Sequence, residues 1–420
     1  MANIQPRTNK EGKIISYSIR VHKGRDMDGK QLKPYTMTWA VPEGWSERKI
    51  QAELQRQCVL FEKQCKEGTV ADNKQSFEKY AHYVIDLKER TGIKHRTIVG
   101  YRGLMPRITT AIGHIKLADL RPQHLNSFYE QLSKDGANLK TGKKLSTKTI
   151  LEYHSFIRAV LSHAEKETLV IFNVARKATP PKVLHKEANF LEEEDIKNVL
   201  FYLTNEPIKW QVAMQLLIFT GCRRGEIMGL KWNKVDFKNC TIRIEANLLY
   251  TKEKGVFIDT PKTEASKRTL KIPQETINAL KLCKKESNAK RLSLGSYWHD
   301  TDFVFTQEDG KPMHPDSLTD YCVTFKNRYN KIIKKENLEL SQNNQIKFLP
   351  RINPHSFRHS QASLLFFNGA DAITISKRLG HAKVSTTTDI YSHIMHKADE
   401  TASDTLANLF FKPQPIAQNG

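Results

Sequence analysis

The greatest concentration of potentially reactive side chains lies in the segment NPHSFRHS, which begins at Asn353. Asn353 can cap a helix, and Pro354 suits the first helical position. In such a helix His355, Arg358 and His359 have spacings of three and four residues and lie on one face. Two imidazoles beside a guanidinium are unfavourable unless a negatively charged group binds among them. The segment therefore predicts an anion site.

Zinc is the main alternative for this face, because His355 and His359 have the spacing of two zinc ligands on a helix. The metalloprotease motif, however, has Glu after its first His, whereas Ser356 stands here. The permanent charge of Arg358 also repels a cation. A phosphate or a carboxylate suits this face better, and we expect neither a metal nor another cofactor.

A second candidate segment is TGCRRGEIMGL, in which Arg223 and Glu226 lie three residues apart. Taken alone, the pair is most simply a surface ion pair that contributes little to stability. Gly221 nevertheless interrupts an apolar helix, and this break would let Arg223 emerge beside the core.

A third candidate segment is DTPKTEASKRTLKIP, which carries Lys262. We expect this lysine between two strands of a hairpin, at the tip or edge of a small sheet. A lysine in such a turn is most often simply solvated. Lys267 and Arg268 lie close by, so the spacing alone does not single out one basic residue.

A fourth candidate segment is KRLGHAKVSTTTDIYSHIMH. Gly380 and His381 are expected to end one helix, and Tyr391 lies on the next. Neither His381 nor Tyr391 would indicate a function by itself, since both residue types commonly have structural roles.

The order of these parts resembles the tyrosine recombinases, above all the integrases of phages and conjugative transposons. The shared order is Arg…Glu, a hairpin Lys, His-x-x-Arg-His, Gly-His and a Tyr ten residues later. The resemblance covers residues from about 188 to 400 and the helical block before them. The N-terminal part resembles the arm-type DNA-binding domains of that group.

The resemblance implies Tyr391 as a nucleophile that becomes linked to a 3′ phosphate of DNA. It implies His355 as the group that takes the tyrosine proton, and Lys262 as the acid that protonates the 5′ leaving oxygen. A covalent link of this kind conserves the phosphodiester energy, so rejoining requires no nucleotide and no metal.

The remaining residues of the pattern would stabilise charge. Arg223 and Arg358 would hold the non-bridging phosphate oxygens, with His381 as a further donor. Glu226 would orient Arg223, and His359 would support the same site.

The implied function is site-specific recombination that integrates and excises a mobile element, such as a phage genome, through a 3′-phosphotyrosine intermediate. One alternative is a type IB topoisomerase, which uses a similar Arg-Lys-Arg-His-Tyr set. Another is a DNA-binding regulator without activity. The arm-like module and the motif LGHAKVSTTTDIYSH favour the recombinase.

Composition agrees with a DNA partner. The 420 residues carry a formal charge of +22, with 39% hydrophobic and 27% charged residues, which is typical of a folded protein that binds nucleic acid. The apolar run VAMQLLIF is far too short to span a membrane, and the polar N-terminus predicts no signal peptide. The six cysteines form no regular framework. We expect a cytoplasmic, nucleoid-associated protein in a bacterial host, without a membrane partner.

The expected fold is multidomain and mainly α, with small β-sheets. Alternation over 15–22 and 35–41 predicts a hairpin, and a helix follows from Ser46 to about Gly68. Helices are expected from Ser76, from Pro122 and after the sequence LST. Alternating segments near the third quarter of the chain predict a small antiparallel sheet; they are 241–246, 256–260 and 268–273.

These patterns and the resemblance predict five parts. Residues 1–68 form an arm-binding module and 73–178 a helical, SAM-like core-binding domain. The linker 179–187 contains two prolines and precedes the catalytic domain 188–410 and a tail, 411–420.

Basic residues of the first two parts are expected to contact arm-type and core-type sites on double-stranded DNA. They are Arg20, Lys23, Arg25, Lys30, Lys33, Lys140, Lys143, Lys144, Lys148 and Arg158. The resemblance also implies assembly as a tetramer on DNA, with helper proteins that bend DNA or set direction.

Overall fold

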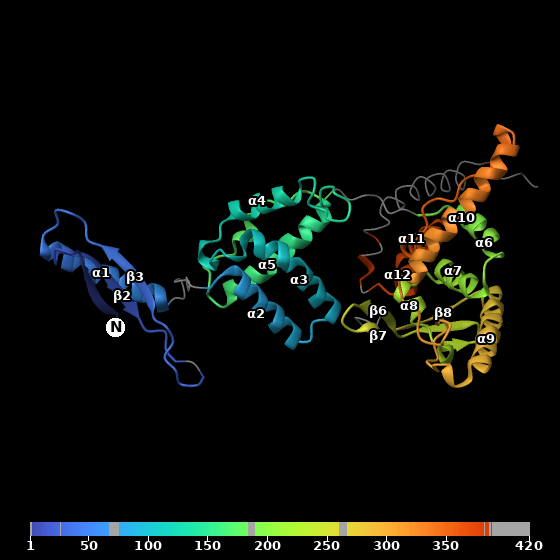
Figure 1. The fold of residues 1–420 in the computed structure, drawn as a ribbon, viewed down its shortest axis with the longest axis horizontal. Coiled ribbons are helices and arrows are strands. Elements are labelled where there is room, and N and C mark those ends of the chain that lie inside the picture. The colour runs from blue at the N-terminus through green and yellow to red at the C-terminus, as the bar shows by residue number, and fades with distance from the viewer. Residues whose placement is uncertain are drawn as a thin grey trace, which may run out of the picture. The chain divides into compact units, whose positions relative to one another are not determined.

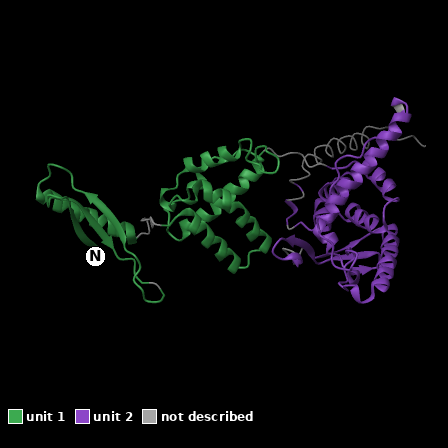
Figure 2. Cartoon of the chain, viewed as in Figure 1, with its two compact units in different colours: residues 1–185 green, residues 186–420 purple. Residues whose placement is uncertain are grey.

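The chain forms two compact units, Met1–His185 and Lys186–Gly420 (Figure 2). The computed structural model describes residues 2–25, 27–66, 75–183, 190–259, 267–381, 383–385 and 388. Within these ranges no helix is both long enough and apolar enough to cross a membrane.

The first unit begins with a three-stranded antiparallel sheet in the order β1-β2-β3, followed by a helix (Figure 1). The strands are β1 (Asn3–Thr8), β2 (Ile14–Val21) and β3 (Tyr35–Ala40), and the helix is α1 (Glu47–Lys66). The predicted strands and helix are therefore present. The sheet contains β1 in addition to the two strands of the expected hairpin. The sequence did not indicate β1, because this strand is fully exposed and shows no apolar alternation.

One face of this sheet packs against α1. Tyr17 and Ile19 of β2 are buried with Leu54, Cys58 and Phe61 of α1. Successive side chains of a strand point to opposite faces, so the intervening polar residues of the strands lie on the face away from the helix.

The rest of the first unit is a helical block with its own hydrophobic cluster. Ser146 Oγ caps the last helix by accepting from Thr149 N (3.1 Å), and Pro122 occupies the first position of its helix. The predicted helix starts are confirmed, whereas α3 is not among the expected helices. The elements are α2 (Phe77–Arg90), α3 (His95–Ile108), α4 (Pro122–Leu132) and α5 (Thr147–Lys166), with short turns at Thr109–Gly113, Leu117–Asp119 and Val174–Arg176.

The second unit is mostly helical around one large core. Helix α7 is apolar on nearly every side and packs against α9 and α11, which explains why its sequence lacks a polar stripe. The helices are α6 (Glu193–Leu203), α7 (Ile208–Thr220), α8 (Arg224–Met228), α9 (Gln274–Leu294), α10 (Ser317–Glu339), α11 (Pro354–Phe367) and α12 (Ala372–Leu379), with short turns at Trp232–Lys234, Gly295–Tyr297 and Gln342–Asn344.

The strands of the second unit form two separate antiparallel sheets. One has the order β4-β5-β8, from β4 (Val235–Asp236), β5 (Thr241–Ile244) and β8 (Arg268–Lys271). The other is the hairpin of β6 (Asn247–Thr251) and β7 (Gly255–Asp259).

The expected pairing around Lys262 was wrong. Strand β7 pairs with β6 and β8 with β5, so the strands on either side of Lys262 belong to different sheets. The physical reason is local: Gly255 has φ +66° at the end of a short turn, and closing a short loop costs little entropy. The apolar residues of β6, which were not predicted as a strand, complete this hairpin.

Candidate active site

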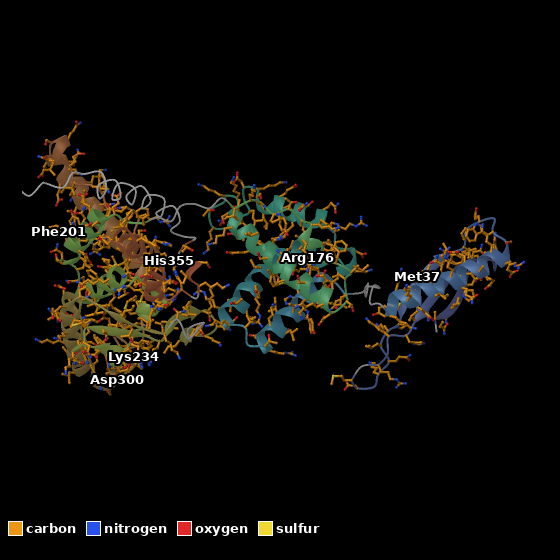
Figure 3. All side chains as sticks on the ribbon, turned by 180° about the vertical axis from the view of Figure 1, so that it is seen from behind. Met37, Arg176, Phe201, Lys234, Asp300 and His355 are labelled. Carbon is orange, nitrogen blue, oxygen red and sulfur yellow. The ribbon has the colours of Figure 1, made fainter. Side chains whose placement is uncertain are left out.

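Helix α11 begins as the sequence predicts. Asn353 Oδ1 accepts hydrogen bonds from the backbone N–H groups of His355 (2.9 Å) and Ser356 (3.0 Å), and Pro354 is the first helical residue. His355 is exposed beside this end of the helix (Figure 3). Arg358, one turn later, is buried.

Arg358 is a buried cation with an unusual environment. Its side chain belongs to a residue only 5% exposed, and Nη1 donates to Gly221 O (2.8 Å). Nη2 is buried and has no hydrogen-bond partner within the described part of the chain. Burial, followed by the charge of Arg223, lowers the pKa of Arg358 to about 10. The guanidinium is therefore held where an anion would stabilise it.

The turn between α7 and α8 places Arg223. Gly221 ends α7 with φ +59°, and a Cβ there would lie 2.3 Å from Gln361 Oε1, so glycine is required. Arg223 follows at the N-cap of α8, with its side chain 40% exposed. The expected break in the apolar helix is confirmed.

Glu226 holds Arg223 at two points. Its Oε2 accepts from Arg223 N (2.9 Å) and its Oε1 from Arg223 Nη1 (2.8 Å). The Glu226 side chain is 7% exposed, so this is not the surface ion pair of the simpler interpretation. Arg223 Nη2 also donates to Gly380 O (3.3 Å), which joins α8 to the end of α12.

His381 lies directly after that glycine. Gly380 ends α12 with φ +68°, and His381 N donates to Ser376 O (3.0 Å). Partial burial, then the charges of Arg358 and Arg223, lower the pKa of His381 to about 4. His381 at the end of α12 is therefore close to both Arg358 and Arg223, although Arg223 is distant from it in sequence.

The other two histidines are shifted in the same direction. His355 is exposed as a residue, but the protein around its ring removes part of its hydration, and this desolvation, then the charges of Arg358 and Arg223, lowers its pKa. Burial, then His355 and Arg358, lowers the pKa of His359. Neutral imidazoles at pH 7 can accept a proton or donate one hydrogen bond each. The site therefore combines permanent guanidinium charge with uncharged proton carriers.

One residue at this site was missed by sequence reasoning. Arg268 of β8 has a side chain only 7% exposed, and its Nη2 donates to Glu226 Oε2 (2.8 Å). Only its alternation with Leu270 and Ile272, both buried, could have indicated an inward position.

Lys262 and Tyr391 lie outside the described residues. Five of the basic DNA-binding candidates are exposed in the first unit, around the α4–α5 connection and on α5; they are Lys140, Lys143, Lys144, Lys148 and Arg158.

The five arm candidates are only partly where the alternation suggested. Arg20 lies on β2, whereas Lys23, Arg25, Lys30 and Lys33 belong to the β2–β3 connection. Lys23 Nζ sits 4.8 Å from the Tyr35 ring centroid. These four residues are therefore not spaced along a strand, because the connection is longer than a tight turn.

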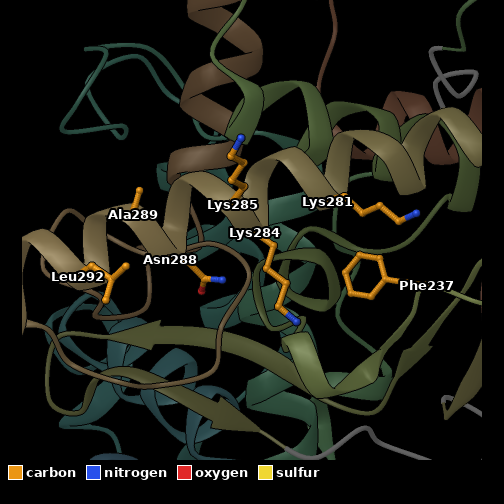
Figure 4. Close-up of a pocket in the computed structure, with 7 residues that line it drawn as sticks. All are labelled: Phe237, Lys281, Lys284, Lys285, Asn288, Ala289 and Leu292. Atoms are coloured by element: carbon orange, nitrogen blue, oxygen red, sulfur yellow. The ribbon is translucent and has the colours of Figure 1, made fainter.

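A separate surface hollow lies along α9, where Lys281, Lys284 and Lys285 flank Phe237 and Leu292 (Figure 4). Lys284 Nζ is 5.2 Å from the Phe237 ring centroid. None of the candidate catalytic residues that the structure describes lines this hollow.

Residues 189–397 match the model of the phage integrase family. The chain is a tyrosine recombinase of this family. It is 26% identical over 415 residues to a tyrosine recombinase XerC-like protein of Caldanaerobacter subterraneus subsp. tengcongensis, covering 94% of this chain and 96% of the relative. The recombinase is accordingly an enzyme of the class that cuts and rejoins DNA for site-specific integration.

Solved structures share the fold. The Tn1549 transposon integrase in complex with a circular intermediate DNA matches with a TM-score of 0.63 at 19% identity, covering 80% of this chain and 100% of that one. A lambda integrase tetramer bound to a Holliday junction matches with a TM-score of 0.51 at 15% identity, covering 92% and 94%. The expected fold, mainly helical with small antiparallel sheets, is confirmed.

Proposed function

We propose that the recombinase cleaves DNA at the cluster of Arg223, Arg358 and His381, with Tyr391 as the nucleophile. The observation that carries the proposal is Arg358, buried with Nη2 unpartnered among the described residues. A scissile phosphate is the ligand that supplies this missing acceptor. Its negative charge would also offset the burial, and then the repulsion between cations, that lower the pKa values of Arg358 and His381.

The proposed step is a balanced transesterification. The Tyr391 oxygen attacks phosphorus and loses its proton to His355, whose lowered pKa keeps it neutral and able to accept. The bond from phosphorus to the 5′ oxygen breaks, and Lys262 protonates that oxygen. Arg223, Arg358 and His381 stabilise the extra charge on the non-bridging oxygens. Attack by the 5′ hydroxyl of another DNA reverses the step and completes recombination.

The test of this assignment is a covalent adduct on a nicked core-site duplex. Tyr391→Phe should bind the duplex with near-normal affinity yet form no adduct, because it lacks only the attacking oxygen. Tyr250→Phe, a change at an exposed tyrosine of the second unit, is the matched control and should form the adduct normally. An adduct that persists in Tyr391→Phe would refute the proposal.

Lys262, rather than Lys267, is proposed as the general acid. Sulfur in place of the 5′ leaving oxygen removes the need for protonation, so Lys262→Ala should regain cleavage on that substrate. Lys267→Ala should be only mildly affected on either substrate. If only the Lys267 variant is rescued, the general acid is Lys267 and not Lys262.

The open face of the N-terminal sheet is proposed to bind arm-type DNA. Its register places Asn3 opposite Arg20, Gln5 opposite Ser18 and, on the other side, Arg20 opposite Thr36. Amide and guanidinium groups read base edges in the major groove, and sheets can enter that groove.

Removing residues 1–68 tests this role. Cleavage of isolated core sites should remain, since the proposed catalytic residues lie beyond 220, while integration between full attachment sites should collapse. Normal recombination of full sites by the truncated protein would contradict the role.

We infer the boundaries 1–68, 73–178 and 188–410, a tetramer on DNA, helper proteins, and action at the nucleoid in the bacterial cytoplasm. The similarity in fold to the lambda integrase tetramer supports a tetramer of this recombinase. Joining of two different duplexes distinguishes recombination from the topoisomerase alternative, which would relax supercoils without such joining.

A further inference from the structure

Arg268 connects three elements of the second unit through one buried guanidinium. From the start of β8, its Nη2 donates to Glu226 Oε2 (2.8 Å) in α8 and to Cys222 Sγ (3.2 Å). Its Nε donates to Arg378 O (2.7 Å) in α12. The Arg268 and Glu226 side chains are each 7% exposed, so these contacts are largely shielded from water.

The charge of Glu226 depends on this contact. Burial alone would raise the pKa of Glu226, but Arg268 and then Arg223 lower it more strongly, and the net shift is downward. Conversely, burial would lower the pKa of Arg268, but Cys222 and Glu226 raise it. Without Arg268, the buried carboxylate would keep the partly exposed Arg223 as its one hydrogen-bonded counter-ion among the described residues.

The same guanidinium also fixes the turn before His381. A Cβ on Gly380 would lie 2.7 Å from Arg268 Nη1, so the turn passes directly over the guanidinium. Gly380 O in turn accepts from Arg223 Nη2 (3.3 Å). Arg268 and Arg223 therefore both contact the turn at Gly380, directly before His381.

We propose that Arg268 is a positioning residue of the recombinase, which keeps Glu226 ionised against Arg223 and holds the Gly380–His381 turn in register with it. The Arg268 side chain is buried against Glu226 and α12, and it acts through these residues. The inference rests on the proposed function of Arg223 and His381.

The first test separates cleavage from binding. In single-turnover cleavage of a core-site duplex, Arg268→Met should lower the rate by about 100-fold, the size expected for misplaced reacting groups. Its Kd for the same duplex should change less than about threefold. Arg268→Lys should recover part of the rate, since it keeps the charge but not the fork of donors.

The matched control is Arg243→Met. Arg243 lies on the neighbouring strand β5, opposite Thr269, and pairs with Glu245 at the surface. This variant should cleave like the wild type. An equal loss in the Arg243 and Arg268 variants would show a general effect on the sheet and would overturn the proposal.

The second test is a pH profile, which a merely structural role would not change. Loss of Arg268 raises the pKa of Glu226, so the rate of Arg268→Met should fall more steeply than that of the wild type as pH decreases from about 7.5 to 5. In the double variant with Glu226→Gln this extra dependence should disappear, and the two losses should combine to less than their product. Arg268→Lys, which retains the charge and is expected to fold, should keep a pH profile close to that of the wild type. Unchanged profiles with fully multiplicative losses would overturn the proposal.

The outcomes distinguish this inference from the function on which it rests. An adduct formed by Tyr391→Phe would refute the proposed function, whatever the Arg268 variants do. If Tyr391→Phe is inactive while Arg268→Met cleaves at the wild-type rate, only the role of Arg268 is refuted.

Discussion

The two regions proposed to bind DNA differ in the environment of their positive charges, which are buried in one and exposed to water in the other. At the candidate active site, Arg358 is buried and its pKa is depressed. On the open face of the N-terminal sheet, Arg7 is exposed and Arg20 is partly exposed, among uncharged polar neighbours. The buried charge is maintained at a cost in free energy, whereas the exposed charges remain hydrated.

This difference assigns different tasks to the two regions. A guanidinium already out of water interacts strongly with charge that develops in a transition state, and needs no reorganisation at that moment. An exposed guanidinium releases counterions when it meets a phosphate, so it contributes salt-dependent affinity. We therefore expect rate to depend on the first region and affinity for arm sites on the second.

The largest effect is expected at the buried charge. Arg358→Ala should reduce the single-turnover cleavage rate by about 1,000-fold, the upper range for loss of one preorganised donor. Core-site affinity should change far less, as gel-shift titration can measure. A large loss of affinity with little loss of rate would remove the distinction between the two regions.

A smaller effect is expected from the sheet, and it should appear in the affinity for DNA and not in the cleavage rate. Arg20→Ala should weaken arm-site binding by about tenfold and reduce the slope of log K against log salt by about one. Cleavage of isolated core sites should be unchanged. The matched control is Arg48→Ala on α1, the helix that covers the other face of the sheet, and it should bind arm sites normally. Equal weakening by both variants would argue against the open face.

A modest pH effect on stability follows from the histidines. The folded pKa of His381, about 4, lies below its unfolded value of about 6.5, so the unfolded chain binds the extra proton between these values. The contribution of His381 to the free energy of unfolding should be constant above about pH 6.5. As pH decreases from 6.5 to 5, this contribution should lower the free energy of unfolding by on the order of 1 kcal/mol per pH unit. Denaturant titration should show a shallower decline for His381→Gln. An identical decline would mean that His381 is not desolvated.

The smallest effect is expected from chelation. Because the guanidinium of Arg358 repels a cation at the place where a metal would bind phosphate, cleavage should be unaffected by EDTA. Activity lost on chelation and restored by zinc or magnesium would contradict this expectation.

Local features of the site could be predicted because neighbouring residues determine them. Asn353 and Pro354 start α11 regardless of the surrounding fold, and Gly380 ends α12 through its left-handed conformation. Likewise, Arg223 and Glu226 are close enough in sequence for their spacing to imply contact.

Other features depend on tertiary contacts that spacing does not reveal. The contact between Arg268 and Glu226 joins residues 42 positions apart, and a buried arginine runs against the usual preference of charged side chains. Strand β1 has no apolar face to indicate it. Its pairing with β2 follows from edge hydrogen bonding, which leaves no mark in the side-chain pattern.

The most direct test of the central claim changes the charge of the phosphate instead of the protein. A methylphosphonate at the scissile position removes the negative charge of one non-bridging oxygen, so the guanidinium that neutralises it is no longer required. The single-turnover rate of Arg358→Ala relative to wild type should then recover from a loss of about 1,000-fold to a loss of less than about tenfold. A loss of the same size on both substrates would contradict the claim that buried Arg358 serves the scissile phosphate.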